Sequence, residues 1–339
     1  MNKQRITMED IAKSAHVSKM TVSRVFSSKP GVSNATRQRI LEVAEHLGYN
    51  LPQHLSHSFN TNKVIALLIP DYPTIYLGEI LRGISHAATQ LNCDLMLYTH
   101  TLFKLAIDPN NTLSAFHTGL IDGALLIAPR EYETLVAEVN RYDLPYVIID
   151  HRSETNSEAS VTATNRKGML DATRYLLALG HTRIGFVTGR MDIVCSHDRL
   201  QGYKDGLLEV DIPIQDDLIL EGDFRQSSGF QLAQQLLRSD NPPTALLMSN
   251  DLMALGAMEA ALINGLTIGK DISIIGFDDV FIASQSHPPL TTVRQPLKDM
   301  GAVALDILVA LQQQRPMLSF TNELPTELII RETTGRPTP

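Results

Sequence analysis

Hydrophobic positions recur along the chain in short unbroken runs, separated by longer stretches with helical spacing. The runs lie at residues 64–69, 95–98, 124–127, 146–149, 184–187, 245–248 and 272–275. Near-continuous apolar strands are typical of parallel sheets that are buried on both faces. Helical stretches between them include 166–179, closed by Gly180, and 252–264, closed by Gly265. The pattern predicts an α/β body with parallel sheets.

The first fifty residues follow a different pattern, which predicts three short helices. Thr7 can cap a first helix with Asp10 as its capping-box partner, Ser18 can cap a second over 19–26, and Ser33 can cap a third. The third helix carries an apolar stripe and then Gly48 at the position after its end; the stripe is Ile40, Val43, Ala44 and Leu47. Two helices joined by a tight turn at 16–17 and supported by a third predict a helix-turn-helix, whose second helix reads DNA.

Length and composition restrict the class of protein. A chain of 339 residues is long enough for two or three domains. Its apolar runs are far shorter than the roughly 18 residues of a membrane span, and its start lacks the apolar core of an export signal. Cys93 and Cys195 are its only cysteines and lie far apart, so neither a disulfide framework nor a metal site is expected. We expect a cytoplasmic protein without a membrane partner or a cofactor.

The charge is unevenly distributed along the chain. Residues 1–60 contain eight Lys or Arg and four Asp or Glu, a net charge of +4, whereas the whole chain carries −8 and the remainder therefore −12. A basic head on an acidic body is typical of a nucleic-acid reader attached to a sensor. From the charge distribution alone, chance clustering of a few charged residues remains an alternative explanation.

Polar residues follow several of the predicted strands. Asp71, Asp150, Asn250 and Asp278 stand at or just past strand ends. Ligands bind open parallel sheets at the carboxyl ends of the strands, and carboxylates with an amide suit sugar hydroxyls. Asp251 and Asp279 lie beside two of these residues, and a helix N-cap is the favoured role for both.

The head resembles that of the LacI/GalR family of bacterial transcriptional regulators. The resemblance lies in residues 7–12 (TMEDIA), 17–25 (VSKMTVSRV) and 47–49 (LGY). It implies that Lys19 and Met20 read base edges in the major groove, and that Thr21, Ser23 and Arg24 share base and phosphate contacts. It also implies DNA-binding positions in the flanking segments, namely Thr7, Ser18, Ser33, Asn34 and Tyr49. The chain departs from the family at His16, where a glycine is usual and where a positive φ would strain a histidine.

The same resemblance implies a hinge at residues 51–62. Family members carry a short helix there that pushes an apolar wedge into the minor groove. The register makes Phe59 the wedge and places Ser56 where a small alanine is usual. The alternative is a linker whose Phe59 packs on the body.

The body resembles the family's sensor, a periplasmic-binding-protein-like domain of two lobes joined by three crossovers. The matching segments are 199–203 (RLQGY), 221–224 (EGDF), 249–256 (SNDLMALG), 276–279 (GFDD) and 288–295 (PPLTTVRQ). The resemblance implies an N-lobe of about 63–164 and 294–322 and a C-lobe of about 165–293 and 323–335. Its effector contacts would come from Asp71, Tyr72, Tyr76, Asp150, Arg199, Phe224, Asn250, Asp278 and Gln295. Phe224 would stack on a sugar face, although it could instead be a core aromatic, and Arg199 could be a surface ion-pair residue.

Together these features predict a repressor that a small sugar releases from a palindromic operator. A purine, a nucleoside or a sugar acid remains the alternative effector. An enzyme that uses the α/β body, such as a sugar kinase or a dehydrogenase, would need a phosphate-binding loop, yet the sequence has neither G-x-G-x-x-G nor a Walker A lysine motif. A transport protein would need an export signal and no basic head. The chain ends without a leucine heptad segment, so a homodimer is expected.

Overall fold

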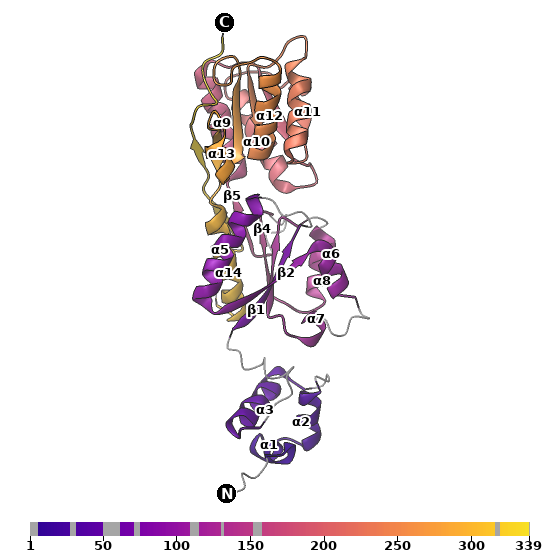
Figure 1. Cartoon of the computed structure of the whole chain (residues 1–339). Coiled ribbons are helices and arrows are strands. Elements are labelled where there is room, and N and C mark those ends of the chain that lie inside the picture. Colours follow the sequence, from indigo (N-terminus) through magenta and orange to yellow (C-terminus); the bar gives the residue numbers. More distant parts are fainter. Residues whose placement is uncertain are drawn as a thin grey trace.

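The computed structural model describes residues 6–27, 32–49, 62–70, 75–108, 115–129, 132–151, 158–315 and 319–338. They form a helical head and two α/β lobes (Figure 1). Four residues named above, Ser56, Phe59, Asp71 and Tyr72, lie outside the described residues, as does most of the predicted hinge. None of the helices in the described ranges has the length and apolar character that a membrane span requires.

The head consists of α1 (Met8–Ser14), α2 (Lys19–Phe26) and α3 (Asn34–His46). The capping box is present: the Thr7 hydroxyl accepts from the Asp10 amide at 3.4 Å, and the Asp10 carboxylate accepts from the Thr7 amide at 2.8 Å. The Ser18 hydroxyl accepts from the Thr21 amide at 3.1 Å. The Ser33 hydroxyl likewise accepts from the Thr36 amide at 3.3 Å. The three predicted helices and their three caps are therefore confirmed.

Two residues of the head adopt left-handed backbone conformations. Gly48 has φ of 72°, as expected of the residue after a helix. His16, in the turn between α1 and α2, has φ of 53°, so the position where the family uses glycine does require the strained conformation. The turn still forms because Ile11, Val22 and Ile40 are fully buried beneath it and fix the three helices against one another.

The N-lobe is a six-stranded parallel sheet covered by helices on both faces. Its strand order is β11-β5-β4-β3-β1-β2. The strands are β1 (Lys63–Ile69), β2 (Cys93–Thr99), β3 (Gly123–Ile127), β4 (Tyr146–Ile149), β5 (Ser160–Ala163) and β11 (Thr321–Leu324). α5 (Ile75–Leu91) and α14 (Leu297–Gln312) cover one face. α6 (His100–Ala106), α7 (Ala115–Thr118) and α8 (Tyr132–Asn140) cover the other.

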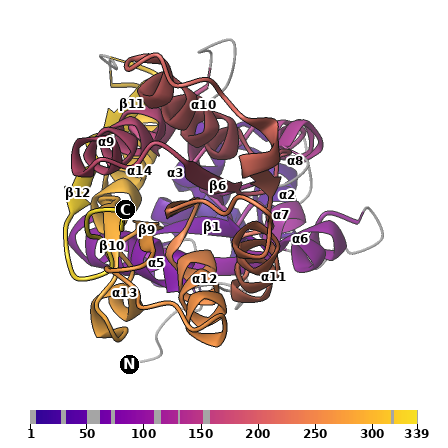
Figure 2. The same cartoon turned by 90° about the horizontal axis from the view of Figure 1, so that it is seen from above.

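The C-lobe repeats this arrangement, with one difference. Its strand order is β12-β10-β9-β8-β6-β7, and β12 runs antiparallel to β10. The strands are β6 (Ile184–Thr188), β7 (Ile219–Glu221), β8 (Ala245–Met248), β9 (Ser273–Asp278), β10 (Thr291–Arg294) and β12 (Glu327–Ile329). Figure 2 shows α9 (Asn165–Leu179) and α10 (Val194–Leu208) on one side of the sheet, opposite α11 (Gln226–Leu237) and α12 (Asp251–Ile263). The short α13 (Phe281–Gln285) follows β9.

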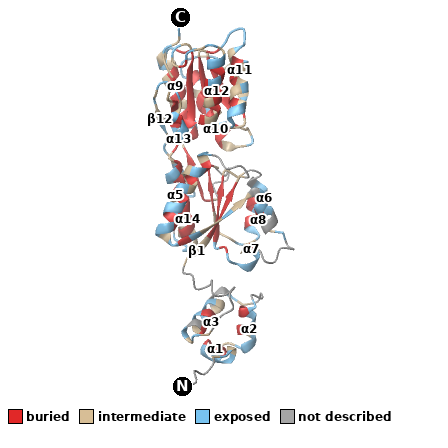
Figure 3. Cartoon of the chain, viewed as in Figure 1, coloured by how far each residue is buried: buried red, intermediate tan, exposed pale blue. Residues whose placement is uncertain are grey.

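The unbroken apolar runs arise because both faces of each sheet are covered. Ile65 and Leu67 of β1 pack under α5 and α14, whereas Ala66 and Leu68 pack under the helices of the opposite face. The strands therefore form the most buried layer of each lobe (Figure 3). All seven predicted runs are strands. Five strands escaped prediction, namely β5, β7, β10, β11 and β12, because they are short and most carry polar residues.

The chain passes between the two sheets three times, at residues 163–165, 294–297 and 324–327. The last passage falls slightly beyond the expected boundary at 322–323. The first and third passages are joined directly: the Thr326 amide donates to the Thr164 hydroxyl at 3.0 Å, and the two hydroxyls lie 3.0 Å apart. Arg294 and Glu327 form an ion pair of 3.4 Å between the second and third. The three passages therefore form one cross-linked junction.

Candidate functional site

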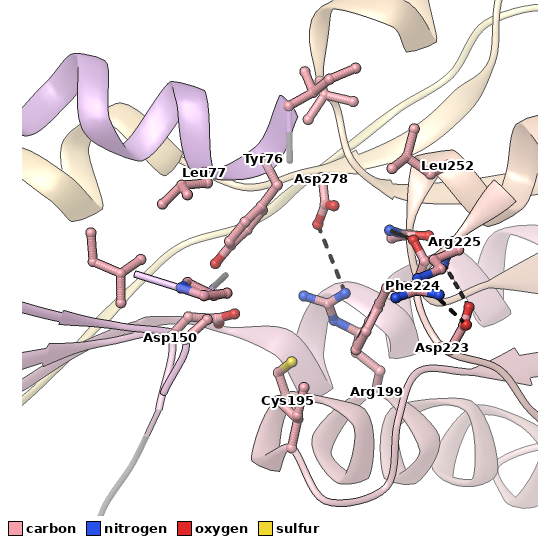
Figure 4. Close-up of a pocket in the computed structure, with 17 residues that line it drawn as sticks. Tyr76, Leu77, Asp150, Cys195, Arg199, Asp223, Phe224, Arg225, Leu252 and Asp278 are labelled. Carbon is pink, nitrogen blue, oxygen red and sulfur yellow. Dashed lines mark hydrogen bonds and ion pairs between the residues drawn. The ribbon is translucent and has the colours of Figure 1, made fainter. Parts of the chain in front are cut away.

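A cavity of about 160 Å³ lies between the two lobes, at the carboxyl ends of their strands (Figure 4). Its lining is mainly apolar, with a few convergent polar groups, as in typical small-molecule sites. The N-lobe contributes Pro70, Ile75, Tyr76, Leu77, Ile127, Ala128 and Asp150. The C-lobe contributes Ile193, Cys195, Arg199, Asp223, Phe224, Arg225, Asn250, Leu252, Asp278 and Val280. Both sheets therefore supply strand ends to one cavity, as the sequence predicts.

Arg199, on α10, is the buried cation of this site. Its exposed fraction is only 2%, so its interpretation as a surface ion-pair residue is wrong. Its Nε donates to Oδ1 of Asn165 at 2.8 Å, its Nη1 donates to the carbonyl of Ser249, and its guanidinium lies 3.9 Å from the centre of the Phe277 ring. Oδ1 of Asp278 lies 3.8 Å from Nη1. These contacts hold the planar guanidinium in one orientation.

Asp278, at the end of β9, is held from behind by Gln295. The Gln295 amide Nε2 donates to Asp278 Oδ1 at 2.7 Å. Gln295 is absent from the cavity lining, so the structure places it as a support for Asp278 and away from the cavity surface. Burial raises the pKa of Asp278 to about 7, although Arg199 and Gln295 act in the opposite direction.

Asp150 and Tyr76 face the cavity from the N-lobe. Asp150 Oδ1 and the Tyr76 hydroxyl are both buried, and neither has a hydrogen-bond partner among the described residues. Burial raises the pKa of Asp150, and burial together with the Asp150 and Asp278 charges raises the pKa of Tyr76. Buried polar atoms without hydrogen-bond partners cost free energy. A ligand that forms hydrogen bonds with these two oxygens would remove that cost and would therefore bind more tightly.

Strained backbone concentrates around the cavity. Ala128, Asp150, Phe224 and Asp278 all have positive φ, with values of 43°, 61°, 67° and 113°. Each such residue costs about 1–3 kcal/mol and persists only where the surrounding structure enforces it. The fold thus turns the chain sharply at four points where it lines the cavity.

Asn250 lines the cavity from the C-lobe, as expected, whereas its neighbour Asp251 does not line it. Asn250 is the N-cap of α12: its Oδ1 accepts from the Met253 amide at 2.9 Å and its Nδ2 donates to the Phe224 carbonyl at 3.0 Å. The prediction that Asp251 is the N-cap is therefore wrong. Asp251 is fully buried and accepts from the Val280 amide at 2.8 Å and from the Thr292 hydroxyl. Its burial, together with the neighbouring Asp278 charge, raises its pKa.

Asp279 is not a helix cap either. Its carboxylate pairs with Arg294 at 2.8 Å and with Arg331 at 2.6 Å, and α13 begins only at Phe281. Asp279 therefore belongs to the junction between the lobes.

Phe224 lines the cavity and also packs against the hydrophobic core under α11 and α12. The two alternatives stated for it are therefore compatible. Its ring lies on Gly189, where a Cβ atom would come within 1.9 Å of Phe224 Cζ.

Several lining residues were missed from the sequence. Cys195 is one helical turn before Arg199, and that spacing could have identified it. Burial and the charge of Asp150 raise the pKa of its thiol, which is therefore protonated. Leu77, Leu252 and Val280 are apolar residues within two positions of the predicted polar ones. In the described ranges, His, Cys, Asp and Glu side chains form no cluster of three that could hold a metal ion.

The predicted reading helix α2 exposes both polar residues and the apolar Met20. The Lys19 side chain is 66% exposed and the residue Met20 is 68% exposed. Ser23 and Arg24 are also exposed. The Thr21 hydroxyl instead lies 2.8 Å from that of Ser18.

The flanking residues of the head stand at helix ends. Thr7, Ser18 and Ser33 precede the three helices, and Asn34 is the first residue of α3. Helix N-termini favour phosphate groups. The Tyr49 ring stacks on Phe26 at 5.4 Å between centroids, so its packing role is visible in the structure.

Comparisons with known proteins match both parts of the chain. Residues 7–51 match the family model "Bacterial regulatory proteins, lacI family", and residues 173–334 match "Periplasmic binding protein-like domain". The HTH-type transcriptional repressor CytR of Escherichia coli (strain K12) is 34% identical over 330 residues, which are 97% of this chain and 96% of that protein. Catabolite control protein A of Priestia megaterium is 32% identical over 337 residues, 97% of this chain and 99% of that protein.

Two solved structures are similar in fold to this chain over nearly its whole length. The lac repressor dimer bound to operator and the anti-inducer ONPF has a TM-score of 0.71 and 28% identity, covering 98% of this chain and 100% of that one. The complex of the transcriptional regulator CelR with cellobiose has a TM-score of 0.73 and 27% identity, covering 97% and 100%. The head and the two-lobed body together define a DNA-binding transcriptional repressor with a ligand-binding domain, which is not an enzyme. The chain belongs to the lacI family of bacterial regulatory proteins.

Proposed function

We propose that this repressor binds a palindromic operator as a homodimer and is released when a small neutral sugar enters the interlobe cavity. The observation that carries the sugar assignment is the pair of buried, unpartnered oxygens of Asp150 and Tyr76, which share a small cavity with Arg199 and Asp278. A sugar hydroxyl both donates and accepts, so adjacent hydroxyls can serve carboxylates and a guanidinium together.

The charges of the site favour a neutral ligand. The carboxylates of Asp150, Asp223 and Asp278 line the cavity together with only two guanidinium groups, those of Arg199 and Arg225. A sugar acid would add a further negative charge beside them, which is unfavourable in a buried site. The CelR structure contains cellobiose, and a LacI family regulator from Enterococcus faecium, with a TM-score of 0.71 and 25% identity, was solved with bound ribose.

DNA recognition is assigned to α2. An exposed lysine can donate to guanine O6 and N7, and a methionine can pack on a thymine methyl group, which are the roles proposed for Lys19 and Met20. A homodimer would place two such helices on the half-sites of a palindrome. The lac repressor structure to which this chain is similar is a dimer bound to operator.

A purine or nucleoside is the second candidate effector. The ring of Phe224 in a mainly apolar cavity could stack on a base as well as on a sugar face. The HTH-type transcriptional repressor PurR of Aliivibrio salmonicida is 32% identical over 311 residues, 89% of this chain and 91% of that protein.

A thermal-shift panel tests the effector class directly. It would cover monosaccharides, disaccharides, sugar phosphates, sugar acids, nucleosides and nucleobases. A ligand at 100 times its Kd stabilises the native state by about 2.7 kcal/mol, which gives a measurable rise in Tm. We expect neutral sugars to raise Tm and to lower operator affinity in fluorescence anisotropy. A response to nucleobases or sugar acids alone would contradict the sugar assignment.

A further inference from the structure

Glu9, near the start of α1, lies beside the first residue of the reading helix α2. Its Oε2 is 3.6 Å from Nζ of Lys19, and the two side chains are 62% and 66% exposed. We propose that Glu9 is a further specificity-determining residue, which reads one base pair of the operator together with Lys19. Lys19 donates to the guanine of this pair, and Glu9 accepts from the N4 amino group of its cytosine. The inference rests on the proposed function, which assigns Lys19 to a base edge.

The two acidic residues at the start of α1 have different contacts. The Asp10 carboxylate belongs to the capping box, where it accepts from both the amide and the hydroxyl of Thr7. The Glu9 carboxylate has the ion pair with Lys19 as its one polar contact among the described residues. An exposed ion pair of this kind contributes little to stability. The Glu9 carboxylate therefore keeps acceptor capacity for a donor outside the protein.

The place of the Glu9–Lys19 pair in the head directs it toward the bases. In a helix-turn-helix, the N-terminal residues of the second helix contact base edges in the major groove. Lys19 is the first residue of α2, so Glu9 stands beside the base-reading end of that helix. A carboxylate close to DNA is repelled by the phosphates and loses hydration, which is unfavourable unless it accepts a hydrogen bond. In the major groove, the amino groups of cytosine and adenine are the donors.

An amine beside a carboxylate matches the order of polar groups in a G·C pair. Guanine O6 accepts from cytosine N4 within the pair, so these two atoms lie about 2.9 Å apart, and the second N4 hydrogen faces the major groove. Lys19 Nζ and Glu9 Oε2 present a donor and an acceptor at a similar spacing, 3.6 Å. A T·A pair offers O4 and N6 in the same order, but thymine lacks the N7 acceptor that guanine adds for a lysine. The geometry therefore favours G·C.

The particular contribution of Glu9 is to determine which strand carries the guanine. A lysine is a flexible point charge, so by itself it can donate to guanine on either strand. With Glu9 beside it, an inverted C·G pair would place guanine O6 against the carboxylate and cytosine N4 against the amine. Both contacts are repulsive, and such repulsion is a common source of specificity.

The test starts from an operator selected by the full-length protein from double-stranded DNA with randomised inverted repeats. Fluorescence anisotropy then gives Kd for this operator and for operators in which each half-site base pair is inverted or replaced. The variants are Glu9→Ala and Glu9→Gln, together with Lys19→Ala, which locates the base pair that Lys19 reads. The matched control is Glu42→Ala, which removes one negative charge from an exposed position on α3 of the same head.

We expect Lys19→Ala and Glu9→Ala to change the preference at the same base pair. Wild type should bind the inverted pair about 5- to 150-fold more weakly than G·C, the range for one good base contact. Both Glu9 variants should lose most of this ratio, because alanine cannot accept and a glutamine amide donates as well as accepts. Glu42→Ala should keep the ratio. Loss of a negative charge raises the affinity for all DNA alike, so only the ratio is diagnostic.

A modified base tests the direct contact with cytosine. N4-methylcytosine retains the pairing hydrogen on N4 but presents no N4 hydrogen to the major groove. Placed at the base pair located by Lys19→Ala, it should weaken the binding of wild type and leave that of Glu9→Ala unchanged.

Three results would overturn the inference in different ways. If Glu9→Ala keeps the wild-type ratio while Lys19→Ala changes one position, Glu9 reads no base and the role proposed for Lys19 stands. If Glu9→Ala loses the ratio but N4-methylcytosine does not weaken wild type, Glu9 only positions Lys19 and the cytosine contact is wrong. If Lys19→Ala changes no position, or no operator is selected, the inference falls together with the role proposed for Lys19.

Discussion

The amide of Gln295 donates to the carboxylate of Asp278 at 2.7 Å, and this bond links the end of β9 in the C-lobe to a residue two positions before the start of α14 in the N-lobe. A second link lies beside it, because Arg294, the residue before Gln295, pairs with Asp279, the residue after Asp278, at 2.8 Å. A ligand that moves Asp278 therefore acts on the start of α14, which packs along α5.

Gln295→Met should weaken the coupling between ligand and operator. The variant keeps the side-chain volume but leaves Asp278 Oδ1 without the Gln295 donor, so only the Arg294–Asp279 pair still links this end of β9 to the segment before α14. Coupling free energies are typically 1–3 kcal/mol, and we expect about half to be lost. The measurement is operator affinity by fluorescence anisotropy with and without saturating ligand. Unchanged coupling in the variant would show that the Gln295 bond transmits nothing.

Asp278→Asn should weaken ligand binding without affecting operator binding. Losing a charged hydrogen-bond acceptor costs about 1.5–3 kcal/mol, roughly a 10- to 150-fold increase in ligand Kd. Asparagine tolerates the positive φ of this position, so the backbone should be retained. Calorimetry with the ligand and anisotropy with the operator separate the two functions. An equal loss of both affinities would remove Asp278 from the ligand site.

Asp278 should also make stability depend on pH. Its folded pKa of about 7 is above its ordinary value near 3.8, so the folded protein holds a proton that the unfolded chain releases between these values. This contribution is fully present below about pH 4 and is lost as the pH rises through 7. Asp150, Asp251 and Arg199 face the same group.

Asp278→Asn cannot titrate at this position, and without the Asp278 charge the raised pKa of Asp251 should fall. Both changes reduce the loss of stability that the wild type undergoes as the pH rises. Relative to wild type, the variant should therefore gain stability from about pH 4 to 7 and reach a plateau above that range. Urea unfolding across this range measures the difference. A difference that stays constant with pH would contradict the raised pKa.

Arg199→Ala should destabilise the fold by about 3–5 kcal/mol. Removing one member of a buried charge pair leaves Asp278 uncompensated and also removes the donor to Asn165. Arg82→Ala is the control, because Arg82 has a 70% exposed side chain and pairs with Glu79 on the surface. The control should change the free energy of unfolding by less than about 1 kcal/mol. A loss for Arg199→Ala as small as that of the control would mean that its buried contacts stabilise nothing.

Met20→Ala should lower operator affinity and leave stability unchanged. The residue is 68% exposed, so its truncation should change the free energy of unfolding by less than about 0.5 kcal/mol. Loss of an apolar contact to a thymine methyl should reduce the preference for thymine at one base position in each half-site. Binding to operator variants measures this preference, with Gln38→Ala on the exposed face of α3 as control. An unaltered preference would place Met20 away from the bases.

The sequence predicts what depends on burial and local capping. Runs such as 124–127 are apolar at every position because helices cover both faces of the sheet, and the pattern is visible without a structure. Thr7 and Ser18 cap helices through neighbours three residues away, which sequence spacing can also identify.

Side-chain direction and backbone strain were not predictable in the same way. Gln295 was expected in the cavity, but whether an amide faces a ligand or a neighbouring carboxylate depends on contacts 17 residues apart. The strands β10 and β11 contain Thr and Asn, so the burial of β10 and the partial burial of β11 come from the elements packed around them and not from their own composition. The positive φ of Phe224 is likewise imposed by its surroundings, since its residue type gives no sign of it.

The order of elements along the chain also determines when each part can be completed during synthesis. The hydrophobic core of the head is contained within residues 6–49, so the head can fold as soon as these have left the ribosome. The N-lobe sheet, by contrast, is complete only once β11 has been synthesised, and one of its faces is fully covered only once α14 has been synthesised. The C-lobe sheet is complete only after β10 and β12. All four elements lie after residue 290. A nascent chain therefore has its DNA reader long before either half of its sensor, and premature termination would release a folded head that no ligand can control.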